Sequence, residues 1–253
     1  MSESDFVGDK SSSQSQLASK LHLAGLLLLL CGLIAAGVLS QHQAAATSAG
    51  NASASQLADH SKAIPFYVSA LVIDWALFCY CYIGVRWNGG TLATLSGGRW
   101  KRPKEILVDI MIAALFWVIW EGTAYGTHFL LDRLFPGTKV AAMDSLLPRS
   151  WNEVALWMIL CVSAGICEEV VFRGYLQKQF LALTGSVAVA IALQGVVFGI
   201  SHGYQGWKNV TVISIFGVLF GILAAWRGNL RANIITHAWS DTWEGWLQFL
   251  FFK

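Results

Sequence analysis

The sequence predicts an all-α fold, a polytopic membrane bundle of about seven transmembrane helices around a central polar cavity. Hydrophobic residues make up 55% of the 253 residues, whereas charged residues contribute only 13%. A soluble domain carries roughly 25% charged residues, so this chain has too little polar surface to coat a water-soluble globule. The 12 tryptophans and 14 phenylalanines are typical of membrane-interface belts. This composition excludes a chain that is disordered over most of its length.

Apolar segments of membrane-spanning length recur along the chain, because a bilayer core needs about 20 apolar residues per helix. They cover approximately residues 21–40, 64–85, 105–125, 153–175, 183–203, 210–226 and 232–252. The first segment is long for a signal-peptide core, so we interpret it as a retained span rather than a cleaved signal peptide. Residues 41–62 are rich in Ala, Ser and Gln, which is typical of a flexible loop.

These segments divide the chain into three parts. Residues 1–20 are polar and Ser-rich and are predicted to be disordered, and residues 21–149 hold the N-terminal transmembrane helices and loops. Residues 150–253 form a C-terminal transmembrane core that carries the polar residues of greatest chemical interest. All five cysteines lie in apolar runs without Cys-x-x-Cys spacing, so we interpret them as reduced thiols.

Lysine and arginine residues predict how the helices are oriented, because cytoplasmic loops carry an excess of them. The densest positive cluster is the loop that contains Arg86, Arg99, Lys101, Arg102 and Lys104. Alternating the spans from this loop predicts a multi-pass protein with its N-terminus in the cytoplasm. The absence of an obvious cleavable signal favours the plasma membrane as its location. The net charge of +2 is too small to indicate a nucleic-acid partner, so the expected surroundings are the lipid bilayer.

Three groups of polar residues interrupt the apolar segments of the C-terminal core. A charge at membrane depth is costly, so it usually faces a cavity or a partner and marks function. In the first group, Glu168 and Glu169 point in different directions from a helix, and Arg173 lies one turn after Glu169 in the favourable order for an ion pair. We therefore expect Arg173 to neutralise Glu169, which leaves Glu168 available for chemistry.

The other two groups are Phe198 with His202, and His237 with Asp241, each pair spaced by one helical turn. A carboxylate one turn from an imidazole fixes the tautomer of the ring and raises its basicity. Taken singly, a buried histidine such as His202 is more often a structural residue than a catalyst, and the His237–Asp241 pair is also consistent with a polar helix end. Together they indicate hydrolysis, in which a carboxylate takes a proton from water and imidazoles position the water or stabilise an oxyanion.

The same side chains are also ordinary ligands for zinc, with Glu168, His202 and His237 as the candidate set. The His-Glu-x-x-His signature of common zinc proteases is absent from the sequence. A divalent metal such as zinc and a metal-free mechanism therefore both remain open at this stage.

The order Glu168-Glu169-x-x-x-Arg173, Phe198-x-x-x-His202, His237-x-x-x-Asp241 resembles the three motifs of the CAAX-protease and bacteriocin-processing (CPBP, or Abi) family of intramembrane proteases. The resemblance covers roughly residues 150–245, so residues 150–253 would be a CPBP-like catalytic core. It implies a helical fold whose conical cavity opens toward the cytoplasm. The family is described both as metalloproteases and as metal-independent glutamate proteases.

The resemblance also implies roles for single residues. Glu168 corresponds to the general base that activates water, His202 to a residue that positions this water, and His237 to the second catalytic histidine. Asp241 stands where the family often has Asn, which is thought to help stabilise the oxyanion. An ionised Asp cannot donate a hydrogen bond, so Asp241 is either protonated or orients His237 or a metal. Glu169 and Arg173 would form a supporting ion pair, next to Phe198.

The leading hypothesis is therefore an intramembrane endopeptidase that cleaves a membrane-associated or small peptide substrate with a Glu-activated water and two histidines. The alternative is a non-catalytic bacteriocin self-immunity or peptide-binding membrane protein. A third hypothesis is a proton or ion transporter that uses Asp74, Glu121, Glu168 and the histidines as a relay. A thiol mechanism through Cys167 is disfavoured, because the two neighbouring acids suppress the thiolate. Helix alternation also places His202 at the far end of its span from Glu168 and His237.

Overall fold

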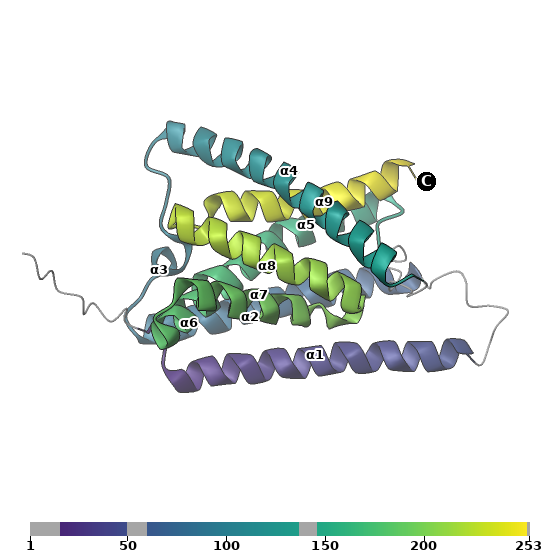
Figure 1. Ribbon diagram of the computed structural model, residues 1–253, viewed down its shortest axis with the longest axis horizontal. Coiled ribbons are helices and arrows are strands. Elements are labelled where there is room, and N and C mark those ends of the chain that lie inside the picture. The colour runs from purple at the N-terminus through teal and green to yellow at the C-terminus, as the bar shows by residue number, and fades with distance from the viewer. Residues whose placement is uncertain (1–15, 50–59, 137–145, 252–253) are drawn as a thin grey trace, which may run out of the picture.

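A computed structural model describes residues 16–49, 60–136 and 146–251, and all the regular secondary structure in these ranges is helical (Figure 1). This confirms the predicted all-α fold. The N-terminal helices are α1 (Lys20–Ala49), α2 (Ala63–Trp87), the short α3 (Leu92–Ser96) and α4 (Pro103–Leu134). The C-terminal core contains α5 (Trp151–Glu168), the π-helix η4 (Glu169–Leu176), α6 (Gln177–Thr184), α7 (Val187–Ser201), the 3₁₀ turn η5 (Gly203–Gln205), α8 (Trp207–Arg227) and α9 (Arg231–Phe251).

Five helical segments in the described part of the chain are long and apolar enough to cross a membrane. They are Lys20–Leu39, His60–Trp87, Pro103–Leu134, Trp151–Thr184 and Trp207–Arg227. The apolar α7 is shorter, at 15 residues, and α9 is 21 residues long but carries His237, Asp241 and Glu244 among its apolar side chains. These seven segments correspond in order to the seven apolar segments of the sequence.

Three boundaries differ from the sequence-based expectation. Helix α1 continues to Ala49, so the predicted loop at 41–62 is wrong for residues 41–49, where the abundant alanines favour a helix; residues 50–59 lie outside the described part. Disorder is also wrong for the end of the 1–20 segment, since the Leu17 amide donates to Gln179 Oε1 at 2.8 Å. Residues 1–15 are not described, and their predicted disorder stays a prediction.

The third difference concerns the first helix of the core, which does not end near residue 175. It passes from α5 through η4 into α6 and stops at Thr184, where Gly185 adopts a left-handed conformation with φ of 67°. The wider turns of η4 begin at Glu169, directly after Glu168. Such π-helical insertions are frequent at functional sites, because they re-aim side chains within a continuous helix.

Close helix crossings depend on residues without bulky side chains. A Cβ atom at Gly217 of α8 would lie 2.6 Å from the Cα of Gly195 in α7, so these two helices are in backbone contact. A Cβ atom at Gly165 of α5 would lie 3.0 Å from Ala238 of α9. Figure 1 shows α7 and α8 side by side, with α4 crossing over α9. The crossing of α5 with α9 brings Glu168 and Glu169 next to His237.

One end of the bundle gathers positive charge, and we call it the Lys/Arg-rich end. Asp109 of α4 is fully buried there and accepts hydrogen bonds or ion pairs from Arg227 at 2.8 Å, Arg231 at 3.3 Å and Trp100 at 2.8 Å. Lys178 Nζ donates to the carbonyl oxygens of α3 residues. The described cations of this end are Lys20, Arg86, Arg99, Lys101, Arg102, Lys104, Lys178, Arg227 and Arg231. The end therefore contains the loop that the sequence predicts to be cytoplasmic.

Candidate active site

Glu169 is the centre of the buried polar network. Its side chain is fully buried, and Oε1 pairs with Arg173 Nη1 at 2.9 Å, the ion pair that their spacing predicts. The same oxygen accepts a hydrogen bond from His237 Nδ1 at 2.9 Å. Asn233 Nδ2 donates to the second oxygen at 3.2 Å. With a guanidinium, an imidazole and an amide around it, the Glu169 carboxylate is fully compensated and holds the His237 ring in place.

The other nitrogen of His237 faces the cavity. Nε2 lies 3.6 Å from Glu168 Oε2 and 3.6 Å from Asp241 Oδ2, just beyond direct hydrogen-bonding distance of both. The Glu168 and Asp241 side chains are 19% and 36% exposed, whereas His237 is only 5% exposed. The sequence predicted that Asp241 would fix the tautomer of His237, but it is Glu169 that bonds to Nδ1, and Asp241 flanks the opposite nitrogen.

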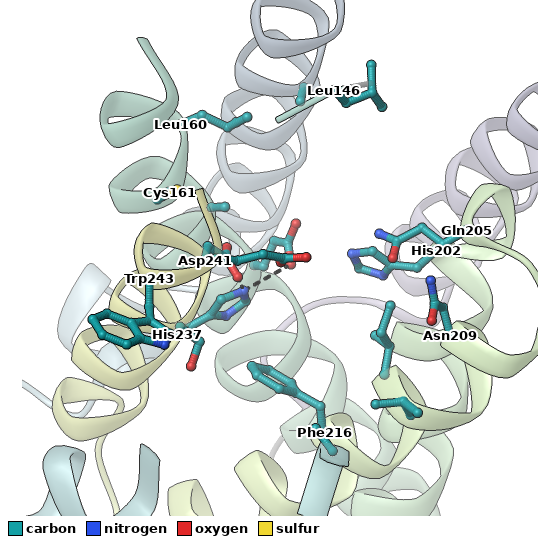
Figure 2. A pocket seen from close by; sticks show the side chains of 18 of the residues that line it. Leu146, Leu160, Cys161, His202, Gln205, Asn209, Phe216, His237, Asp241 and Trp243 are labelled. Carbon is teal, nitrogen blue, oxygen red and sulfur yellow. Dashed lines mark ion pairs between the residues drawn. The ribbon is translucent and has the colours of Figure 1, made fainter. Parts of the chain in front are cut away.

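His202 lies at the C-terminal end of α7, across the cavity from Asp241 (Figure 2). Its Nδ1 donates to the carbonyl oxygen of Phe198 at 3.0 Å, so in the neutral ring the unprotonated Nε2 is an acceptor. The Phe198 ring lies 4.9 Å from the His202 ring, centroid to centroid. Phe198 therefore supports His202 with both its carbonyl group and its ring.

The four candidate catalytic residues, Glu168, His202, His237 and Asp241, line a single cavity of about 730 Å³. Its wall is formed by parts of α2, α4, α5, α7, α8 and α9, together with Leu146, Leu147 and the η5 turn. Figure 2 shows Asp241 and His202 on opposite sides, with Phe216 below them. The structure thus brings Glu168, His202, His237 and Asp241 together from three separate helical segments. This volume lies within the usual range of ligand-binding pockets, roughly 300–1,000 Å³.

The depth of His202 agrees with the depth of Glu168, contrary to simple helix alternation. With 15 residues, α7 is about 22 Å long, less than the roughly 30 Å hydrocarbon core of a bilayer. The chain turns back at Gly185 between α6 and α7, and Glu168 and His202 lie at similar separations along the chain from that turn. Both side chains consequently meet at the same level.

The ion pair is enclosed by aromatic rings that the sequence analysis overlooked, apart from Phe198. The Arg173 guanidinium lies 4.4 Å from the centre of the Phe198 ring and 5.5 Å from that of Phe216. Phe216 also packs against His237, with ring centroids 5.0 Å apart. Rings at this distance exclude water from the Glu169–Arg173 pair and add cation–π attraction. Sequence gave no signal for Phe216, because it is one apolar residue among many in α8.

Asn233 was also overlooked, although it lies one turn before His237 on the same face of α9. A second amide contact, from Asn233 Nδ2 to the Phe220 carbonyl at 2.8 Å, ties α9 to α8. The repeated spacing of Asn233, His237 and Asp241 is a signal that a search for polar residues at one-turn intervals would have found.

A metal site is not supported by the arrangement of these side chains. Within the described residues, no group of three or more His, Cys, Asp or Glu side chains converges in a geometry that would hold a metal ion. Of the candidate set, Glu168 and His237 Nε2 lie 3.6 Å apart, whereas His202 stands across the cavity.

Comparison with known proteins bears on the C-terminal core. Residues 150–243 match the family model described as Type II CAAX prenyl endopeptidase Rce1-like. The match confirms the predicted family resemblance. It covers less than half of the chain and includes the five motif residues that line the cavity, Glu168, Phe198, His202, His237 and Asp241. No curated protein and no solved structure matched the chain significantly. The resemblance and the apolar helices together support a multi-pass membrane protease.

The position of the cavity bears on two predictions, that the Lys/Arg-rich loop is cytoplasmic and that the cavity opens toward the cytoplasm. The cavity lies in the half of the bundle away from the Lys/Arg-rich end and extends to Leu146 and Gln205, which belong to loops at the opposite end. A cytoplasmic Lys/Arg-rich end and a cavity that opens to the cytoplasm are therefore incompatible in this fold.

Proposed function

We propose that the protein is an intramembrane endopeptidase in which Glu168 activates the attacking water. The observation that carries this proposal is the different environment of two adjacent acids. Glu169 is fully paired and buried, whereas Glu168 faces the cavity next to the Nε2 atom of His237. A carboxylate held at a cavity surface, with an oriented imidazole beside it, has the geometry of a general base.

The proposed reaction begins with a water molecule between Glu168 and His202. Glu168 removes a proton from this water while the Nε2 atom of His202 accepts its second hydrogen as a hydrogen bond. The water oxygen attacks the carbonyl carbon of the scissile bond and forms a tetrahedral oxyanion. As the C–N bond breaks, Glu168 returns the proton to the leaving amine, so the site is regenerated without a covalent intermediate.

His237 is the proposed donor to the oxyanion. In its protonated form it can donate from Nε2 while Nδ1 remains bonded to Glu169, and the carboxylates around it balance the positive charge. Asp241 then acts on His237 rather than on the oxyanion, since a carboxylate cannot donate a hydrogen bond to an anion. This role accounts for an Asp at a position where related proteins often carry Asn.

The substrate is proposed to be a membrane-associated or small peptide that enters from the end opposite the Lys/Arg-rich end. If the Lys/Arg-rich end faces the cytoplasm, as the charge distribution predicts, the scissile bond reaches Glu168 from the non-cytoplasmic side of the plasma membrane.

Comparing new peptide N-termini in membranes that contain equal amounts of wild type or Glu168→Ala tests this function. Termini that depend on wild type are expected, because the variant lacks the base. An Ile73→Val variant, at an exposed position of α2 outside the cavity, serves as the matched control and should reproduce the wild-type termini. Identical termini from all three proteins, at matched and folded levels, would replace the proposal with a non-catalytic peptide-binding or self-immunity role.

A further inference from the structure

Buried carboxylates in the described part of the protein are generally paired with cations of the protein itself. Glu169 is paired with Arg173 at 2.9 Å, and Asp109 is paired with Arg227 at 2.8 Å and with Arg231. Both acids are fully buried. Such pairing is required because an uncompensated charge in a low-dielectric interior costs several kcal/mol.

Asp74 departs from this pattern. It lies near the middle of α2, is only 8% exposed and lines the active-site cavity. Within the described residues, no lysine or arginine forms an ion pair with it and no donor hydrogen-bonds to its carboxylate. The charged groups that act on it are Glu168 and Asp241, which repel it, and His237, whose Nδ1 already serves Glu169.

The surrounding cavity wall supplies no lysine or arginine to compensate Asp74. The described residues that line it include five carboxylates and three histidines, but neither lysine nor arginine: Asp74, Glu121, Glu168, Asp241, Glu244, His128, His202 and His237. A cavity whose wall holds more acidic than basic groups attracts cationic ligands, and low-dielectric walls strengthen that attraction. An ionised Asp74 carboxylate would therefore pair with a cation from outside the chain, such as a lysine or arginine of the substrate.

We propose that Asp74 is the anchor of a cation-binding subsite that receives a lysine or arginine side chain of the substrate beside the scissile bond. The inference rests on the proposed function and extends it to a substrate class: basic peptides. Because Asp74 lies on α2, outside the matched residues 150–243, the family resemblance does not assign it a role. Its proximity to Glu168 places the bound cation close to the attacking water.

A peptide library tests the proposal without knowledge of the natural substrate. Purified protein in lipid nanodiscs is incubated with proteome-derived peptides produced by cleavage after glutamate, which retain internal lysines and arginines. Mass spectrometry then records cleavage sites that wild type produces and Glu168→Ala does not. We expect Lys or Arg to be enriched at one fixed position near the scissile bond.

Matched variants assign that preference to Asp74. Asp74→Asn should lower kcat/KM for a lysine-containing peptide about 10- to 100-fold, the value of a hydrogen bond to a charged group, and affect its norleucine counterpart much less. Asp74→Glu should keep the preference because it retains the charge. Cys79→Ala, at an exposed position of the same helix outside the cavity, should behave as wild type.

The results distinguish a failure of the proposed protease function from a failure of the Asp74 subsite. If no cleavage depends on Glu168, the proposed function fails, whatever Asp74 does. If Glu168-dependent cleavage shows no basic preference, or if Asp74→Asn keeps that preference intact, the protein is a protease but the Asp74 subsite is wrong. Equal loss of activity by Asp74→Asn on lysine and norleucine peptides would also overturn it, and would indicate a proton-transfer role.

Discussion

At the scale of single residues, two neighbouring glutamates have opposite environments. Glu169 is fully buried, forms an ion pair with Arg173 and accepts hydrogen bonds from His237 and Asn233. Glu168 is 19% exposed and lines the cavity. The difference follows from the angle of about 100° between adjacent helix positions, which directs one side chain into the protein and the other toward the cavity. The proposed mechanism requires both environments, because an acid paired with arginine cannot accept a proton from water.

The first prediction concerns the stability of the two corresponding amide variants. Glu169→Gln should lower the free energy of unfolding by about 3–5 kcal/mol, because it leaves the buried Arg173 charge uncompensated. Glu168→Gln should change it by less than about 1 kcal/mol, since that side chain pairs with no cation of fixed charge. Denaturant unfolding in mixed micelles measures both values. Equal destabilisation would show that the two acids do not have separate roles.

The second prediction concerns Asp241. Because its proposed role is to act on His237, the Asp241→Asn variant should retain peptidase activity to within about tenfold, and its amide gains a donor that can reach the oxyanion. Steady-state kinetics on one cleaved peptide provides the measurement. A loss of 100-fold or more would mean that the carboxylate itself takes part in proton transfer.

At the scale of helices, glycine positions determine how closely the catalytic residues approach. Gly165 lies one turn before Glu168–Glu169, where α5 meets Ala238 and Ile234 of α9. Its missing side chain lets α5 and α9 come near enough for Glu169 to bond to His237. The same crossing is secured by Trp157, whose Nε1 donates to the Asp241 carbonyl at 3.0 Å.

The third prediction tests this crossing. Gly165→Val should push α5 away from α9, lower the free energy of unfolding by about 1–3 kcal/mol and abolish most of the activity. Gly122→Val is the control, because a Cβ at this exposed position of α4 meets no atom within 4 Å. Unfolding and cleavage assays on both variants give the comparison. Wild-type activity in Gly165→Val would show that the close approach is dispensable.

Local spacing explains which parts of the site were predictable. The Glu169–Arg173 pair and the Phe198–His202 pair lie one turn apart, so the sequence alone placed them together. The bond from His237 to Glu169 joins residues 68 positions apart and depends on the α5–α9 crossing, which no periodicity encodes. The continuation of α1 to Ala49 was missed because an Ala-rich composition is shared by loops and helices.

At the scale of the whole molecule, charge and cavity are segregated to opposite ends of the bundle. Lys178, Arg227 and Arg231 anchor the Lys/Arg-rich end around α3 and Asp109, whereas the cavity extends toward the η5 turn. Positive charge next to a span resists translocation, so this segregation predicts which side of the membrane the substrate occupies.

The fourth prediction is the membrane orientation. A cysteine introduced as Lys62→Cys, at the end where the cavity opens, should react with a membrane-impermeant maleimide in intact cells. A cysteine introduced as Lys101→Cys should react only after the membrane is permeabilised. Both positions are exposed, so the difference reports sidedness. The opposite labelling pattern would place the cavity on the cytoplasmic side, as the family resemblance implies.

The most direct test of the central claim is the rate of peptide cleavage by purified Glu168→Gln relative to wild type in the same nanodiscs. The variant keeps the size of the side chain and removes its ability to accept a proton. We predict a fall in kcat of at least about 100-fold, the usual contribution of a general base, with the stability of wild type retained. A folded Glu168→Gln protein that cleaves at the wild-type rate would contradict the assignment of Glu168 as the base.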